Sequence, residues 1–184
     1  DKTVLLCLRS WEPNYGVDVL ARAFVLAARE NPRLRLILLG DGSQADKIYA
    51  LLRGQEEKVY FGGRVELEEL PGWYGAADLY VSPSHVDGSS VSLLEAMACG
   101  LPSIVSDIPA NLEWIQDGRN GWIFPDGDAQ TLARTILTAA EQDWRGFKLQ
   151  ARQDAVQKAD WKAGVQKLLA CYETTAAIGK SRTL

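Results

Sequence analysis

Short apolar runs alternate with helical patterns along almost the whole chain, and this alternation limits the fold more than any other feature. The apolar runs cover residues 4–8, 34–39, 59–61, 79–82, 104–105 and 122–124. Helical spacing covers residues 17–28, 45–52, 66–74, 90–98 and 111–115, and continues from 129 to about 175. Continuous apolar runs are typical of parallel strands that are buried on both faces. The sequence therefore predicts an α/β fold, a Rossmann-like doubly wound parallel sheet.

The length predicts one domain. A domain averages about 150 residues, and the chain has 184. We expect a single domain over residues 1–184, with a core over about 3–142, C-terminal helices over about 143–176 and a frayed tail over 177–184. The chain starts at Asp1 rather than Met, so we expect a processed form or a fragment of a longer protein.

The charge balance argues against a nucleic-acid partner, and the apolar runs argue against a membrane-spanning segment. Lys and Arg number 20 and Asp and Glu number 24, which gives a net charge of −4. Because non-specific binding to nucleic acids depends on clustered positive charge, no nucleic-acid partner is expected. No apolar run approaches the roughly 18 residues of a membrane span, and no signal peptide is visible.

The cysteines and the single histidine argue against a metal site. Cys7, Cys99 and Cys171 lie far apart, without the spacing of metal ligands. Each has apolar neighbours, so we expect buried thiols and a reducing, cytoplasmic location. His85 has no orienting partner evident in the sequence and is expected to be a loop residue rather than a base.

In a doubly wound fold, ligands bind at the carboxyl ends of the strands. Residues 40–45 follow the second run and fit the pattern G-x-G-x-x-A of a dinucleotide site. The match is weak, because Gly62 and Gly63 stand where a ribose-binding carboxylate would end the next strand. A tight turn and a loop that borders a nucleotide both remain open interpretations.

Residues 87–95 are the most informative segment. A glycine and small hydroxyl residues precede a helical pattern, at Gly88, Ser89 and Ser90. Free N–H groups at a helix start, together with the helix dipole, favour a bound phosphate. Serines at this place are also ordinary N-caps, and this alternative stays open.

Glu95 is the only charged residue between Ser89 and Gly100. An apolar helix around one carboxylate indicates a buried position, where that carboxylate needs partners. The hydroxyls of a ribose could be these partners, because they donate hydrogen bonds that a carboxylate accepts. The alternative is a structural hydrogen bond to a loop N–H or to Arg9.

Arg9 ends the first apolar run, where its guanidinium could bind a phosphate in bidentate fashion. The alternative for Arg9 is a surface ion pair with Glu12 or Asp41. Both interpretations remain open.

Between residues 4 and 172 the sequence resembles the carboxy-terminal domain of group 1 glycosyltransferases, a retaining family with the GT-B fold. The motifs that carry the resemblance are residues 77–84, then 87–88 and 93–102, in the family's order and spacing. Residues 38–42, 59–63 and 117–121 add support.

The resemblance implies roles for individual residues. The family has two glutamates separated by seven residues: Asp87 stands at the first, which acts on the donor sugar and is our catalytic candidate, and Glu95 matches the second, which holds the ribose. Arg9 matches an arginine that contacts the donor diphosphate, whereas Tyr15 stands where the family has a second cation, a lysine. The remaining expected substrate-binding residues are Gly40, Asp41, Gly42, Gly63, Gly88, Ser89, Ser90 and Val91.

The resemblance also implies a function. It indicates the donor-binding domain of an enzyme that transfers a hexose from a nucleoside-diphosphate sugar to a glycan, a lipid or another acceptor, without a metal or other cofactor. A separate amino-terminal domain would bind the acceptor and make any membrane contact, so the isolated domain is expected to be inactive. The alternatives are a non-catalytic nucleotide-binding module and an NAD-dependent oxidoreductase domain.

Overall fold

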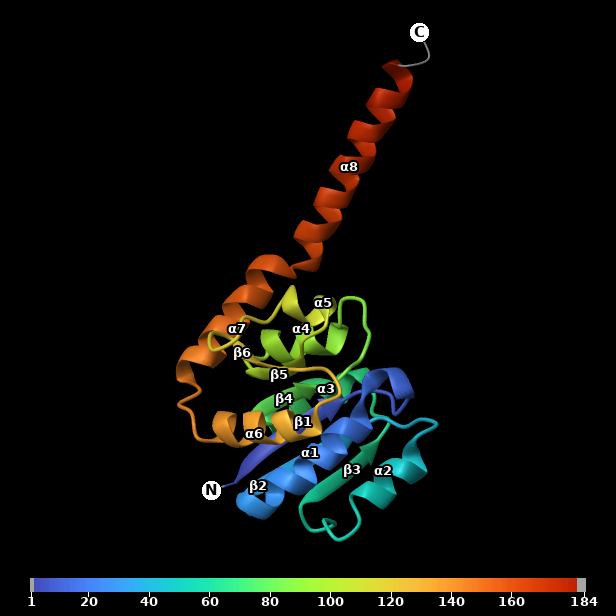
Figure 1. Cartoon of the computed structure of the whole chain (residues 1–184). Coiled ribbons are helices and arrows are strands. Elements are labelled where there is room, and N and C mark those ends of the chain that lie inside the picture. Colours follow the sequence, from blue (N-terminus) through green and yellow to red (C-terminus); the bar gives the residue numbers. More distant parts are fainter. Residues whose placement is uncertain (1, 182–184) are drawn as a thin grey trace.

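The computed structural model describes the backbone of residues 2–181 and the side chains up to residue 175. Its centre is one parallel sheet of six strands in the order β3-β2-β1-β4-β5-β6 (Figure 1). The strands are β1 (Thr3–Leu8), β2 (Leu34–Leu39), β3 (Val59–Gly63), β4 (Leu79–Ser82), β5 (Ser103–Ser106) and β6 (Gly121–Phe124). The predicted doubly wound sheet is confirmed, and four of the strands extend by one or two residues past the expected limits.

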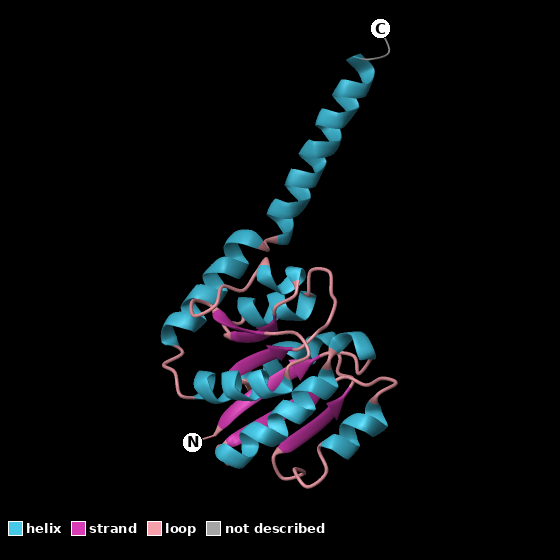
Figure 2. Cartoon of the chain, viewed as in Figure 1, coloured by secondary structure: helices cyan, strands magenta, loops and turns pink. Residues whose placement is uncertain are grey.

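Helices cover both faces of the sheet (Figure 2). On one face lie α1 (Val17–Glu30), α2 (Ala45–Leu51) and α6 (Ala129–Ala140). On the other lie α3 (Leu70–Gly75), α4 (Val91–Ala98) and α7 (Arg145–Lys158), with the short α5 (Pro109–Leu112) nearby. The chain thus has two hydrophobic clusters, one on each side of the strands.

Strand β1 explains why the apolar runs are continuous. Leu5 and Cys7 belong to the cluster under α1, whereas Leu6 belongs to the cluster under α4. Successive side chains of a strand point to opposite faces, so a sheet covered on both sides needs apolar residues at every position.

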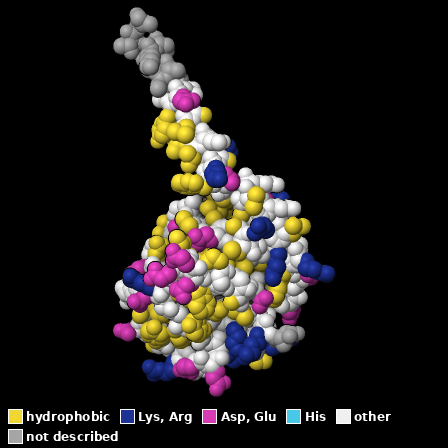
Figure 3. Space-filling view, turned by 180° about the vertical axis from the view of Figure 1, so that it is seen from behind, with side chains coloured by type: hydrophobic (Ala, Val, Ile, Leu, Met, Phe, Trp, Pro, Cys, Tyr) yellow, Lys and Arg dark blue, Asp and Glu magenta, His cyan; other side chains and the backbone are white. Residues whose placement is uncertain are grey.

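The carboxy-terminal helical region is divided into three helices. α6 and α7 pack against α1 and α4, respectively. α8 (Trp161–Ser181) extends away from the sheet (Figure 1), and its residues are exposed from 161 to 175. Because α8 reaches Ser181 and residues 182–184 lie outside the described part, the fraying expected for 177–184 stays a prediction. Apolar side chains gather along α8 (Figure 3).

Three local expectations need correction. The helix expected over 66–74 is a 3-10 turn (Leu67–Glu69) followed by α3, which accepts Pro71 because the proline lies in the first turn, where no intrahelical N–H bond is lost. The helix expected over 111–115 is α5, which starts earlier at Pro109. Cys7 is buried as expected, but Cys99 and Cys171 are exposed, at the end of α4 and on α8.

No helix within the described residues combines the length and the apolar character needed to cross a membrane.

Candidate functional site

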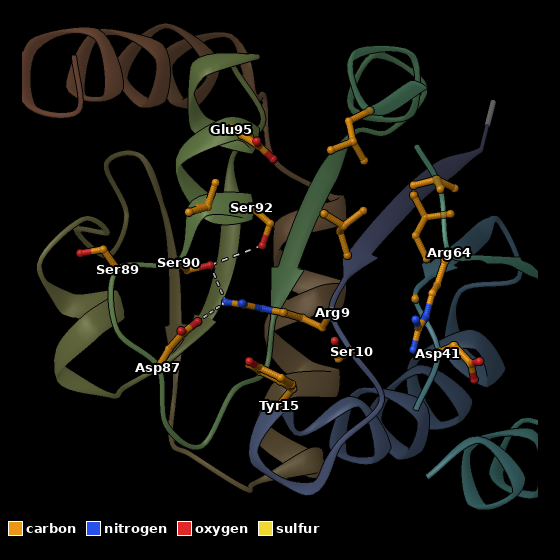
Figure 4. Close-up of a pocket in the computed structure, with 16 residues that line it drawn as sticks. Arg9, Ser10, Tyr15, Asp41, Arg64, Asp87, Ser89, Ser90, Ser92 and Glu95 are labelled. Atoms are coloured by element: carbon orange, nitrogen blue, oxygen red, sulfur yellow. Dashed lines mark hydrogen bonds and ion pairs between the residues drawn. The ribbon is translucent and has the colours of Figure 1, made fainter. Parts of the chain in front are cut away.

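A cleft of about 760 Å³ opens at the carboxyl ends of β1 and β4, where the strand order changes direction (Figure 4). This is the expected ligand position in a doubly wound sheet. The expected residues that line the cleft are Arg9, Gly40, Asp41, Asp87, Ser89, Ser90, Val91 and Glu95. Gly42, Gly63 and Gly88 are not among the residues that line it.

Arg9 is the centre of one end of the cleft. Its side chain is only 9% exposed, and its Nη2 donates to the Asp87 carboxylate at 2.6 Å and to the Ser90 hydroxyl. Nε and Nη2 also donate to Ser82 Oγ, at 3.3 and 2.9 Å. The alternative of a surface pair with Glu12 or Asp41 is wrong, because the chain brings Asp87 to the guanidinium. We call Arg9, Ser82, Asp87 and Ser90 the Arg9 end.

The guanidinium of Arg9 is also covered by an aromatic ring. Its Cζ lies 5.4 Å from the centre of the Tyr15 ring, within the range of a cation–π contact. Burial disfavours the cation, but the neighbouring Tyr80 and Asp87 outweigh it, so the pKa of Arg9 is raised. Tyr15, which stands where the resemblance implies a lysine, therefore covers Arg9 instead of adding a second cation beside it.

α4 begins at the Arg9 end. Ser90 is its N-cap, and the Ser90 hydroxyl accepts from the N–H of Leu93 at 3.3 Å. The capping alternative is confirmed, and the same hydroxyl also contacts Arg9. The next N–H groups, of Val91 and Ser92, have no intrahelical acceptor at this position. The helix start therefore combines a cap with free donors beside a cation.

Glu95 lies one turn into α4 and forms the other end of the cleft. Its Oε2 accepts from the Tyr74 hydroxyl at 2.8 Å. Neither expected alternative partner, a loop N–H or Arg9, contacts it, and the side chain is half-buried rather than enclosed in the core. Burial raises the pKa of the Tyr74 hydroxyl, as does its bond to Glu95, so the phenol stays a donor. We call Tyr74, Ser92 and Glu95 the Glu95 end.

Ser92 joins the two ends. Its hydroxyl accepts from the buried Tyr80 at 2.8 Å and lies 3.4 Å from the Ser90 hydroxyl. Figure 4 shows Glu95, Ser92, Ser90 and Asp87 in succession along one wall of the cleft. A ligand along this wall meets a carboxylate, hydroxyls, a helix start and a cation in turn.

The glycines after β2 are required by close packing. Gly40 has φ of 120°, and a Cβ there would lie 2.2 Å from the Arg9 carbonyl oxygen. A Cβ on Gly42 would lie 2.6 Å from the Trp11 carbonyl oxygen. The turn interpretation explains Gly42, while Gly40 both forms the turn and borders the cleft.

The sequence analysis missed several residues of the cleft. They are Leu8, Ser10, Leu39, Arg64, Val65, Leu70 and Ser92; Tyr15, named above as the residue in place of a lysine, also lines it. Arg64 is the most consequential, because it follows β3 and brings a positive charge to the opposite wall (Figure 4). It is exposed, and no carboxylate of the described residues lies within ion-pair distance of it. Its only sequence signal was its place just after a strand.

His85 has a partner that the sequence did not reveal. Its Nδ1 lies 2.6 Å from the Asp126 carboxylate, in a loop outside the cleft. Trp11, which also follows β1, is buried against Tyr49 and Phe61. Across the described residues, no group of three or more His, Cys, Asp or Glu could hold a metal ion.

Comparison with known proteins relates this geometry to a family. The family profile described as "Glycosyl transferases group 1" matches residues 1–142. Phosphatidyl-myo-inositol mannosyltransferase from Mycobacterium leprae is 30% identical over 97% of this chain and 48% of its own length. The chain thus spans about half the length of the curated relatives it matches.

Two solved structures have the same fold. HepE from Anabaena, described in complex with UDP-glucose, matches with a TM-score of 0.85 and 26% sequence identity. The match covers 95% of this chain and 49% of the HepE chain. Sucrose-phosphate synthase from Thermosynechococcus elongatus has a TM-score of 0.86 and 25% identity and covers 97% of this chain and 46% of its own. The profile, the relatives and the fold agree, and the chain belongs to the group 1 glycosyltransferases, with the Rossmann-like fold of a GT-B domain.

Proposed function

We propose that this chain binds a nucleoside-diphosphate sugar and is the donor-binding half of a retaining hexosyltransferase. The acceptor would be a glycan, a lipid or another hydroxyl compound. HepE, which matches 95% of this chain, is described in complex with UDP-glucose. Several relatives are named mannosyltransferases. These names support a hexose donor.

The observation that carries the proposal is the arrangement of the two cleft ends along α4. Val91 and Glu95 are four residues apart, which is about 6 Å along a helix. That distance is too long for one small anion and suits a ligand that carries both a ribose and a diphosphate. Glu95, with lone pairs left beyond its bond from Tyr74, would accept from ribose hydroxyls.

The diphosphate would bind at the Arg9 end. Every side-chain hydrogen bond that Arg9 makes to a described residue uses Nε or Nη2, which leaves the Nη1 edge for a phosphate oxygen. The N–H groups at the start of α4 add donors and the positive end of a helix dipole. When the bond to the anomeric carbon breaks, these groups would stabilise the charge that develops on the leaving diphosphate.

Asp87 is the proposed catalytic residue. It precedes the phosphate-facing N–H groups of α4, so it would lie on the sugar side of the diphosphate and orient the hexose. Retention of configuration at the anomeric carbon is proposed from the family resemblance. The proposal includes no metal or other cofactor, because the free Arg9 Nη1 edge and the N–H groups at the start of α4 would bind the diphosphate.

The rest of the machinery would lie in an amino-terminal acceptor domain. Relatives extend to about twice the length of this chain, so we expect no sugar transfer by the chain alone. Membrane contact, if the acceptor is a lipid, would come through that other domain. All three cysteines are free, which supports a cytoplasmic location.

A non-catalytic nucleotide-binding module is the second candidate. It is favoured by Tyr15, which places an aromatic ring where the family has a lysine. Joining the chain to an acceptor domain and assaying sugar transfer separates the two candidates.

Calorimetric titration of the purified chain tests donor binding. We expect UDP or GDP and their sugar conjugates to bind weakly, because half of the closed cleft is missing, and we expect no binding of NAD. Binding of NAD without binding of UDP or GDP would instead support the oxidoreductase alternative.

A further inference from the structure

The Arg9 end is neutralised before any ligand arrives. The Asp87 carboxylate lies 2.6 Å from Arg9 Nη2, and the two side chains are only 9% and 15% exposed. At such low exposure the ion pair is weakly screened by solvent. An incoming diphosphate therefore meets a cation whose charge a neighbouring carboxylate already offsets.

Asp87 is one of several residues that hold Arg9 in position. The Ser82 hydroxyl accepts from two guanidinium nitrogens, and the Ser90 hydroxyl accepts from Nη2. Tyr15 covers the guanidinium. Loss of the Asp87 charge should therefore leave Arg9 in place with more of its positive charge available.

The donor and the product of the proposed reaction differ in charge at this position. The terminal phosphate of a free nucleoside diphosphate loses a second proton with a pKa of about 6. The same phosphate in a nucleotide sugar is esterified and cannot carry that additional charge. A fixed carboxylate beside it repels the product more strongly than the donor, and hydroxyls of the sugar can also donate to the carboxylate.

We propose that Asp87 is a specificity-determining residue that makes the cleft prefer the sugar-conjugated diphosphate over the free nucleoside diphosphate. The proposal depends on the donor binding proposed above and assigns Asp87 a second role, the release of product. The repulsion acts at the Arg9 end alone. Asp41, the other aspartate of the cleft, is exposed and makes no ion pair with Arg9 among the described contacts.

The test compares Asp87→Asn with Asp41→Asn, which removes the same charge from the same cleft. Calorimetry near neutral pH gives the dissociation constants of UDP and UDP-glucose, or of GDP and GDP-mannose. In Asp87→Asn we expect the free diphosphate to bind more tightly and the sugar nucleotide not to do so. The ratio of the two constants should change by about tenfold, which corresponds to 1.4 kcal/mol. In Asp41→Asn the ratio should change much less.

A second measurement removes the sugar from the comparison. The β-methyl ester of the same nucleoside diphosphate lacks both the sugar and the additional charge. The wild-type chain should bind this ester more tightly than the free diphosphate, and Asp87→Asn should remove that preference. Equal affinities in the wild type, or an equal change for donor and product in Asp87→Asn, would overturn the proposal. If the wild type bound none of these nucleotides, the donor-binding function itself would be rejected.

Discussion

The two ends of the cleft hold their charged groups in different ways. At the Arg9 end, a guanidinium is fixed by a carboxylate and two hydroxyls and covered by a ring. At the Glu95 end, a half-buried carboxylate has one phenol as its partner. The first end is organised and neutralised without a ligand, whereas the second keeps free acceptor capacity. We therefore expect the Arg9 end to respond to the charge of a ligand and the Glu95 end to respond to its hydroxyls.

The largest expected effect is at the Arg9 end. Arg9→Gln should weaken the binding of a nucleoside diphosphate by about 2–5 kcal/mol, because the phosphates lose their cation while Asp87 stays in place. A nucleoside without phosphates should be nearly unaffected. Calorimetry with both ligands measures the difference, and Arg134→Gln, an exposed change on α6 outside the cleft, is the control. Equal losses for both ligands would abolish the proposed distinction between the two ends.

Glu95→Gln should weaken nucleoside diphosphate binding by about 1–3 kcal/mol, the cost of a lost charge-assisted hydrogen bond. The nucleoside should lose as much as the diphosphate, because both carry the ribose. Glu113→Gln, an exposed change outside the cleft, serves as the control. A sharp fall in melting temperature with unchanged affinity would make Glu95 a structural residue.

Tyr74→Phe should have a smaller effect, about 1 kcal/mol on the same affinities. The phenol orients Glu95, so removing it leaves the carboxylate in the cleft but less well positioned. Calorimetry on the single variants and on the double variant with Glu95→Gln measures the coupling between the two residues. If the two losses simply add, Tyr74 acts independently of Glu95.

Ser82→Ala should weaken diphosphate binding least, by about 0.5 kcal/mol. Ser82 accepts from Arg9, but Asp87 and Ser90 still hold the guanidinium. Binding of the nucleoside alone should not change. If Ser82→Ala equalled the loss in Arg9→Gln, Ser82 rather than Asp87 and Ser90 would be the main support of Arg9.

Much of the fold could be predicted from the sequence, because a sheet covered on both faces needs continuous apolar strands, and these runs are visible without a structure. The residues that line the cleft were partly predictable, since loops at the carboxyl ends of strands meet. Contacts between residues far apart in the sequence could not be predicted. Ser82 and Asp87 contact Arg9 across 73 and 78 residues, and Tyr74 reaches Glu95 from a helix whose limits Pro71 obscured.

The solvent exposure of individual side chains was also predicted poorly. Glu95 was expected in the core because its helix is apolar, but a helix at the edge of a cleft buries only one face. Cys171 was expected to be buried for the same reason, yet α8 leaves the core. Arg64 was not singled out within its strand-end loop, because a single charge in a loop has no periodicity to interpret.

The most direct test of the account is a crystal structure of the chain with a nucleoside diphosphate bound. We predict that the ribose hydroxyls lie within hydrogen-bond distance of the Glu95 carboxylate and that the diphosphate lies between Arg9 and the start of α4. A nucleotide bound with its phosphates at Glu95, or bound outside this cleft, would contradict the division of the site into these two ends.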